Sequence, residues 1–408
     1  MKRPLLALLP ILLLACSTET TTDTSPTVTP STNSTEVATT SVVAATSTTE
    51  PTVSRLSIDQ RLSSAQILDE PERCQIADIT PYEGGSSSGF PRPVDNKLLQ
   101  ELRVLVVPIS VRDYLFSEDD LKLAETGLTK SAEFWNKMSY DKFDLESTIL
   151  PKESWPTFDE TAEQLGLIST GPYTDYQTFA EIALTRLAEN IDTSNFDILF
   201  VALPAANDFY PAQAVSLGEG FISDREVQQR ALIVGGRLLP FWEVIAHELG
   251  HAGFGLEDLY SFETQSNIFG EWDIMQLAIL VPSKEITSWS RWIAGWLDDS
   301  QVQCLEKQDS ATLFIEPIEI ASTQPKSILI RTSPNSVLVA ESRRNLGYDV
   351  SGTSVLIYTV DTSNSHGFGP YKFEGTLNAI GETLTVGSIS FSLADTDVDG
   401  DLVSISIQ

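Results

Sequence analysis

Two histidines and a glutamate form the most chemically suggestive arrangement in the sequence. His247, Glu248 and His251 occur as HELGH within the stretch FWEVIAHELGHAGFGLEDLY. On a helix, residues four apart share one face, so the two imidazoles could bind one zinc ion. Glu248 would then take the proton of a zinc-activated water that attacks a carbonyl, and hand it to the departing amine. Two of the chain's three histidines lie in this motif, which favours a zinc site over a chance match.

The wider context resembles the immune inhibitor A type secreted metallopeptidases of bacteria, which are relatives of the metzincins. The matching stretches lie between about Leu102 and Thr362, in the family's order: EFWNKMSYDKFDLE, AHELGHAGFGLEDLY, GEWDIM, TSWSRWIAGWL, and VAESRRNLGYDV with VLIYTVDTS. The resemblance implies an endopeptidase acting on protein or peptide substrates, whose third zinc ligand is an acidic residue shortly after a glycine. Met275 would be the methionine of the turn beneath the zinc, a role compatible with ordinary core packing.

The spacing after the second histidine departs from the family pattern by one residue. The family has the glycine three residues and the acid six residues after that histidine, whereas Gly255 and Asp258 come four and seven residues after His251. Glu257 occupies the expected offset, but Asp258 keeps the Gly-x-x-Asp-x-Tyr context. We therefore expect Asp258 to be the third ligand, with Glu257 as the alternative.

Two rival interpretations remain open at this point. In a thermolysin-like site the third ligand would be a later glutamate such as Glu271 or Glu285, an arrangement against which Met275 argues. In the other, the chain is a surface binding protein on a catalytically degenerate peptidase scaffold. The extra residue after His251 favours the second rival, and the retained Glu248 argues against it.

The N-terminus is typical of an exported protein. Lys2 and Arg3 precede a short apolar run, Leu5 to Leu14, which reads as a signal peptide. The run ends in LLAC, which resembles the lipobox of bacterial lipoproteins and implies cleavage before Cys16 and lipid attachment to its thiol; the alternative is an ordinary secretory signal. Residues 17–54 are rich in Ser, Thr and Pro and should form a disordered tether.

The two remaining cysteines, Cys74 and Cys304, most simply form one disulfide in an oxidising compartment. In a sharper alternative, Cys74 caps the zinc as a latency switch. Residues 55–98, which contain Cys74, are either a removable propeptide or an N-terminal extension that wraps the next domain.

The rest of the sequence predicts two regions with different patterns of secondary structure. In residues 99–305, buried β-branched runs such as Leu102 to Val111 alternate with helical stretches, and Ser117 followed by three acids is typical of a helix start. We expect a metzincin-like α+β (mixed α/β) catalytic domain here. Residues 306–408 contain short alternating runs separated by turn residues, which predicts an all-β, sandwich-like domain.

Composition narrows the range of partners. The chain has 57 acidic and 26 basic residues, a formal net charge of -31, which argues against binding nucleic acid or an anionic membrane surface. Membrane association would depend on the lipid anchor.

Asp395 to Asp401, DTDVDGD, has the oxygen density of a calcium loop. Ser406 stands where an EF-hand needs glutamate, however, and a β-turn is favoured. The tryptophans of Trp289 to Trp296 are expected to be core residues of the C-terminal subdomain, with a binding platform as the alternative.

Overall fold

The computed structural model describes residues 70–79, 86–91, 98–168, 176–204, 206, 209, 212–217, 220–235, 238, 241–264, 266–305, 310–350, 354–364 and 367–407. All of them belong to one compact unit, Ser57–Gln408. The predicted signal peptide, Cys16 and the 17–54 tether lie outside the described residues, as does most of 55–98. Within the described residues, no helix combines the length and apolar character needed to cross a membrane.

The first half of this unit is built on a five-stranded sheet in the order β3-β1-β5-β7-β6. The strands are β1 (Glu101–Pro108), β3 (Asp144–Ile149), β5 (Ile198–Ala202), β6 (Ala212–Ser216) and β7 (Arg230–Val234). Neighbouring strands are parallel except β6, which is antiparallel to β7 at the edge. A separate short pair joins β2 (Ser110–Val111) to β4 (Thr157–Phe158). The predicted buried runs therefore become parallel strands with both faces covered.

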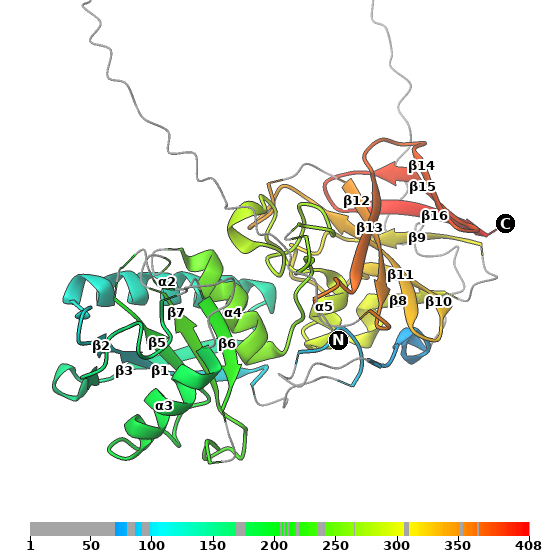
Figure 1. Cartoon of the computed structure of the whole chain (residues 1–408). Coiled ribbons are helices and arrows are strands. Elements are labelled where there is room, and N and C mark those ends of the chain that lie inside the picture. The colour runs from blue at the N-terminus through cyan, green and yellow to red at the C-terminus, as the bar shows by residue number, and fades with distance from the viewer. Residues whose placement is uncertain are drawn as a thin grey trace, which may run out of the picture. The chain divides into compact units, whose positions relative to one another are not determined.

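Helices cover both faces of this sheet (Figure 1). Val104 and Val106 of β1 belong to the core shared with α2 (Glu118–Met138) and α4 (Trp242–Phe254), whereas Leu105 and Val107 pack in a second core with α3 (Tyr176–Ala188). This division follows from the two-residue repeat of a strand, which sends alternate side chains to opposite faces. The predicted start of α2 is confirmed: Ser117 and Asp120 form a reciprocal capping box.

The C-terminal region consists of two sheets, which confirms the prediction that it is rich in β-structure. One has the order β13-β12-β11-β10-β8 and the other β14-β15-β16-β9. The strands are β8 (Val302–Leu305), β9 (Ala311–Ile315), β10 (Ser327–Ser333), β11 (Ser336–Arg343), β12 (Ser354–Asp361), β13 (Tyr371–Leu377), β14 (Thr383–Val386), β15 (Ile389–Thr396) and β16 (Asp401–Ile407). Side chains from both sheets share one hydrophobic core. β8 precedes the expected boundary at residue 306 but pairs with β10.

Short helical elements complete the described fold: η1 (Pro71–Cys74), η2 (Lys152–Ser154), η4 (Ala278–Leu280), α5 (Ser288–Ile293) and η5 (Asp299–Gln301). Trp289, Trp292 and Trp296, on and just after α5, are almost fully buried. They are core residues, as expected, but their core also includes side chains of α2, α4 and the five-stranded C-terminal sheet. The tryptophans therefore join the two regions instead of belonging to the C-terminal one alone.

Cys74 of η1 and Cys304 of β8 are joined by a disulfide that spans 230 positions of the sequence. Both cysteines are buried. The disulfide fixes the N-terminal segment to the first strand of the C-terminal sheet. Because the Cys74 sulfur is bonded to Cys304, it does not reach the histidine pair, and the latency-switch alternative has no support in this arrangement.

Candidate metal centre

The HELGH residues lie on α4, as their spacing predicted. The helix buries Ile245, Leu249 and Phe254 against the main core and directs the two histidines to one side. It ends at Gly255, which has the left-handed backbone angles φ 64° and ψ 28°. The Gly255 N–H donates to the carbonyl of His251, and the next N–H donates to the carbonyl of Gly250. This glycine turn reverses the chain and brings the following residues back towards the histidines.

Three ligand atoms converge next to the helix. The Nε2 atoms of His247 and His251 are 3.1 Å apart. Asp258 Oδ1 lies 3.1 Å from the first of these nitrogens and 3.2 Å from the second. Within the described residues, these three form the one group of potential metal-ligating side chains whose atoms converge in this way.

The outer nitrogens of both imidazoles are held by main-chain carbonyls. Nδ1 of His247 lies 2.9 Å from the carbonyl oxygen of Ile274, and Nδ1 of His251 lies 2.6 Å from that of Leu256. A carbonyl oxygen only accepts, so each Nδ1 carries a proton and donates it. In neutral imidazole this leaves Nε2 with a free lone pair that points into the site, which is the tautomer a metal ligand requires.

The site therefore fits a zinc ion. In an ideal tetrahedron with the usual zinc–nitrogen and zinc–oxygen bond lengths, ligand atoms are about 3.3 Å apart, close to the separations found here. Asp258 Oδ1 is buried with the two Nε2 atoms as its polar neighbours and no separate hydrogen-bond donor, so a cation bound between the three atoms would satisfy it. Three protein ligands are also the number typical of a catalytic zinc, which keeps one position for water or substrate.

The electrostatics of the site favour a positive charge. Burial alone would lower the pKa of His251, but the adjacent Asp258 carboxylate outweighs it and raises that pKa to about 10. Burial would raise the pKa of Asp258, but the two imidazoles outweigh burial and hold it well below its ordinary value. The metal-free cluster thus attracts a cation, and a proton would compete with zinc for it.

The other acidic candidates lie elsewhere. Glu257 Oε2 accepts a hydrogen bond of 2.8 Å from the hydroxyl of Ser86, and both side chains are buried. Glu271 is exposed on a turn. Glu285 is buried but pairs with Arg291 and accepts the N–H of Tyr348 at 3.1 Å. None of the three reaches the histidines, and the turn after Gly255 accommodates the extra residue.

Glu248 lies against the edge strand β6. Its Oε2 accepts a hydrogen bond of 2.8 Å from the backbone N–H of Ala214. Burial raises the pKa of Glu248, against the effect of the two imidazoles. A raised pKa brings a carboxylate nearer to the range in which it exchanges protons near neutral pH. The sequence does not predict β6, because AQAVS is short and has no strongly apolar run.

Met275 packs against α4, the helix that carries HELGH. A Cβ placed on Gly250, the glycine of HELGH, would lie 2.5 Å from the Met275 sulfur, so the glycine makes room for the thioether. The Met275 carbonyl accepts the N–H of Leu259 at 2.9 Å, directly after Asp258. The preceding carbonyl, that of Ile274, holds His247. This turn therefore positions ligands on both the helix and the following loop.

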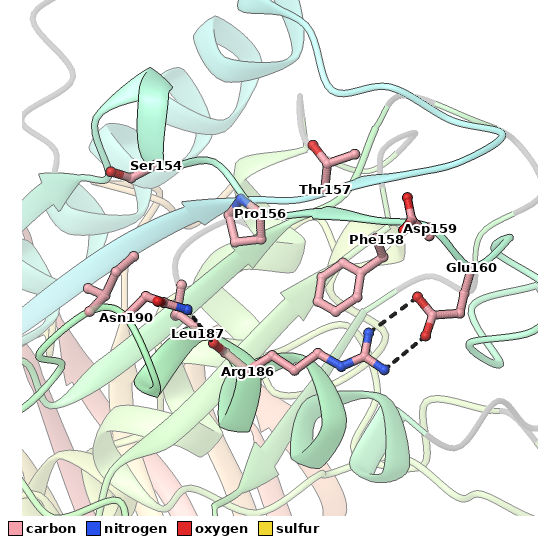
Figure 2. Close-up of a pocket in the computed structure, with 10 residues that line it drawn as sticks. Ser154, Pro156, Thr157, Phe158, Asp159, Glu160, Arg186, Leu187 and Asn190 are labelled. Atoms are coloured by element: carbon pink, nitrogen blue, oxygen red, sulfur yellow. Dashed lines mark hydrogen bonds and ion pairs between the residues drawn. The ribbon is translucent and has the colours of Figure 1, made fainter.

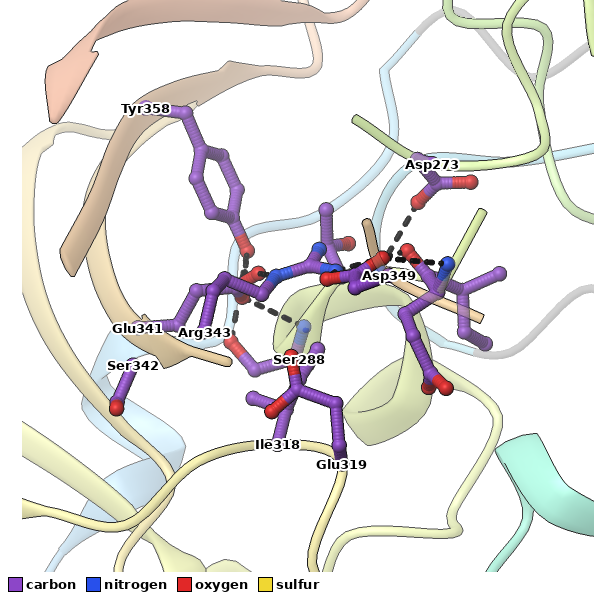
Figure 3. Close-up of polar contacts among 12 residues, drawn as sticks. Asp273, Ser288, Ile318, Glu319, Glu341, Ser342, Arg343, Asp349 and Tyr358 are labelled. Atoms are coloured by element: carbon purple, nitrogen blue, oxygen red, sulfur yellow. Dashed lines mark hydrogen bonds and ion pairs between the residues drawn. The ribbon is translucent and has the colours of Figure 1, made fainter. Parts of the chain in front are cut away.

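Asp273 organises the turn that carries Met275. Its two carboxylate oxygens accept the N–H groups of Met275 and Thr287, each at 2.9 Å. Beyond Thr287, Figure 3 shows Glu341 accepting hydrogen bonds from Ser288, at 2.7 Å, and from Tyr358, at 3.0 Å. The quoted motifs GEWDIM, TSWSRWIAGWL, VAESRRNLGYDV and VLIYTVDTS thus meet in one buried polar network behind the site.

The Arg343 guanidinium forms the cationic centre of this network. It pairs with Glu341 at 2.7 Å and with Asp349 at 2.8 Å, and all three side chains are fully buried. The network lies between α5 and the C-terminal sheet, so it ties the methionine turn to β11. Its residues carried no separate sequence signal, because the contact that joins α5 to β11, from Ser288 to Glu341, links positions 53 residues apart.

Asp273 should give the folded protein a measurable pH dependence. Burial raises its pKa from 3.8 to about 6. The folded state therefore binds this proton more tightly, and the stability it contributes is full below pH 3.8 and lost as the pH rises through 6. We expect the free energy of unfolding of the zinc-free protein, relative to Asp273→Asn, to increase by about 1 kcal/mol between pH 7.5 and 5. Denaturant titrations of both proteins measure this difference, and a constant difference would contradict it.

Two other features lie apart from the candidate metal centre. A pocket of about 360 Å³ is lined by residues from the ranges 154–160 and 186–191 (Figure 2). Within it, Arg186 pairs with Glu160 at 2.8 Å and lies over the ring of Phe158. The pocket shares no residue with the histidine site.

The DTDVDGD stretch forms the turn between β15 and β16, the favoured sequence interpretation. Asp397 accepts the N–H groups of Asp399 and Gly400 at 2.9 and 3.1 Å. Asp401 pairs with Arg344 at 2.9 Å. These two carboxylates are used inside the protein, and calcium binding here remains a prediction from the sequence.

No protein-family model matches the chain, and no curated protein is significantly similar to it. The resemblance to the immune inhibitor A type peptidases therefore depends on the motifs quoted above. Of the residues that these motifs nominate, His247, His251 and Asp258 come together, with Glu248 beside them and Met275 beneath.

Proposed function

We propose that this chain is an exported zinc-dependent endopeptidase, with a metzincin-like catalytic region followed by a sandwich-like β region. The observation that carries the proposal is the convergence of His247, His251 and Asp258 on one point beside Glu248. The resemblance to immune inhibitor A type peptidases supports the same assignment. Both lines lead to hydrolysis of peptide bonds.

Each residue of the site has a distinct role in this proposal. His247, His251 and Asp258 would hold the ion. Zinc bound there would supply Lewis-acid polarisation of the scissile carbonyl and lower the pKa of a water molecule. Glu248 would accept the proton of the attacking water and then donate it to the departing amine. The N–H of Ala214 holds this carboxylate in place at 2.8 Å.

The edge strand β6 suggests how a substrate would be oriented. β6 pairs with β7 on one side and lies at the end of the sheet order. An extended peptide can add to such an edge through main-chain hydrogen bonds, with little dependence on its sequence. Because Ala214 of β6 contacts Glu248, a peptide bound along this edge would bring its backbone next to the catalytic carboxylate.

The cellular setting follows from the N-terminal sequence and is also a proposal. Lipid attachment at Cys16 would anchor the chain to the outer face of a bacterial membrane, with residues 17–54 as a tether; without lipidation the protein would be secreted. The net charge of -31 argues against nucleic acid as a partner. Proteins and peptides outside the cell would then be the substrates.

The rival proposal is that the chain is a surface binding protein on a catalytically degenerate peptidase scaffold. Its main support was the extra residue after His251. In the structure Asp258 Oδ1 is nevertheless 3.2 Å from His251 Nε2, so the longer spacing is no argument against metal binding.

Metal removal tests the proposed function. We expect the purified protein to contain one zinc per chain and to cleave an unfolded protein such as casein. Dialysis against a chelator should abolish cleavage, and one equivalent of zinc should restore it. Zinc content is measured by atomic absorption, and cleavage by the release of fluorescent peptides. Bound zinc without cleavage would favour the binding protein, and no zinc would refute the metal site.

A further inference from the structure

The N-terminal segment, of which residues 74–79 and 86–91 are described, lies directly against the turn that carries Asp258. The Ser87 N–H donates to the carbonyl of Gly255 at 2.9 Å, and Ser87 forms a parallel bridge with Leu256. The Ser86 hydroxyl donates to Glu257 Oε2 at 2.8 Å. The segment therefore contacts three consecutive residues, Gly255, Leu256 and Glu257, immediately before Asp258.

The same segment is itself firmly held by the rest of the fold. Cys74, at its start, is bonded to Cys304 of β8. The carbonyl of Ala77 accepts the hydroxyl hydrogen of Thr362 at 2.7 Å. The carbonyl of Ser88 accepts the indole N–H of the buried Trp289 at 2.8 Å. These contacts fix it to both the C-terminal sheet and α5.

The two described parts of the segment, 74–79 and 86–91, pair with each other and enter the core. The N–H of Phe90 donates to the carbonyl of Ile76 at 2.9 Å, and the Phe90 ring packs edge-on against Trp289 and Trp292. Ile76 is fully buried. A Cβ on Gly89 would lie 2.6 Å from the backbone nitrogen of Asp78, so the two limbs are in close contact. Such packing is typical of a permanent part of a domain.

We infer that residues 74–79 and 86–91 are a permanent brace of the metal centre and not part of a removable propeptide, and that Ser86 and Glu257 are positioning residues for Asp258. Glu257 and Asp258 are adjacent in the chain but turn to different partners. Holding Glu257 against Ser86 keeps that carboxylate away from the histidines and leaves Asp258 to reach them. The inference rests on the proposed function, because it assigns these residues to the same zinc site.

The brace also accounts for the altered spacing after His251. One added residue lengthens the turn between the helix and its third ligand, which by itself would loosen the ligand. Hydrogen bonds from Ser86 and Ser87 restrain that longer turn at two of its residues. Groups that orient metal ligands in this way typically change metal affinity about 10–100-fold when they are lost.

Substitution of Ser86 tests the inference. We expect Ser86→Ala to weaken zinc affinity about 10-fold, measured by competition with a chromophoric chelator, and to change the visible absorption of the cobalt-substituted protein. Ser86→Thr keeps the hydroxyl and should restore both. Ser88→Ala is the matched control on the same segment, because the contacts of Ser88 with Asp78 and Trp289 are made by its backbone and are kept in the variant. The cobalt spectrum depends on the geometry of the metal site. A general loss of stability would leave the spectrum of the folded protein unchanged, so a changed spectrum indicates a changed site.

A metal-free measurement separates this inference from the proposed function. In the zinc-free protein, Ser86→Ala should speed hydrogen exchange of the backbone N–H groups of Gly255, Leu256 and Leu259, while Ser88→Ala should not. If the wild-type protein proves unable to bind zinc but Ser86→Ala still speeds exchange, the zinc site is refuted and the brace stands. Unchanged exchange together with unchanged zinc affinity in Ser86→Ala would overturn the inference. Active mature protein that lacks residues 74–91, detected by mass spectrometry, would overturn it as well.

Discussion

Replacement of Glu248 by glutamine is expected to lower the rate of peptide hydrolysis by about 10²–10⁴-fold, the usual contribution of a general acid–base group. Glutamine keeps the shape of the side chain and an oxygen that can accept the Ala214 N–H. It cannot take the proton of the attacking water. Because Glu248 is not one of the three converging ligands, the variant should still bind one zinc per chain.

The measurement compares kcat/KM for a fluorogenic peptide with zinc content in the same samples. Glu243→Gln is the control, since Glu243 lies in the first turn of the same helix and is not part of the ligand cluster. A Glu248→Gln protein that cleaves as fast as the wild type would refute the proposed mechanism. If the variant loses both zinc and activity, Glu248 is instead needed for zinc binding.

Asp258→Ala is expected to weaken zinc binding by more than about 100-fold, because loss of a ligand should exceed the 10–100-fold effect of outer groups. The substitution removes the one carboxylate within reach of both histidines. The zinc-free variant should remain folded. The substitution removes the repulsion between Asp258 and Glu248 and the attraction between Asp258 and the two imidazoles, and both effects are local to the cluster. Peptide cleavage should fall in parallel with zinc occupancy.

Glu257→Ala provides the matched comparison, because the two acids are neighbours. Glu257 contacts Ser86, so its loss should weaken zinc binding about 10-fold, well short of the effect at Asp258. Competition titrations with a chelator give both affinities. The reverse order, with Glu257→Ala the more damaging, would make Glu257 the third ligand. Equal zinc binding in wild type and both variants would place that ligand elsewhere.

Features that depend on short stretches of sequence were predicted well. The HELGH helix, the Ser117 start of α2 and the strand within Leu102 to Val111 each follow from neighbours within a few residues. Helical and strand periodicity are local properties, so one sequence is enough to recognise them. The parity of the two remaining thiols likewise indicated the pair that the structure joins, Cys74 and Cys304.

Features that depend on distant pairing were not predicted. β6 has a weak local pattern and exists because it pairs with β7. Asp273 contacts Thr287, and Glu341 contacts Ser288, 53 residues before it, so their shared network could not be read from the sequence. Nothing in the sequence indicated that Ser86 would contact Glu257, 171 residues away.

The sequence by itself determined which residues could bind a metal and act as a base, because HELGH encodes one helical face at the required spacing. It left the third ligand open between Glu257 and Asp258, since either lies on a loop whose course local rules do not fix. Only the tertiary structure separated them: the turn at Gly255 directs Asp258 to the histidines, and Ser86 engages Glu257. Long-range contacts decide the direction of a loop side chain, and a single sequence does not contain that pairing in readable form.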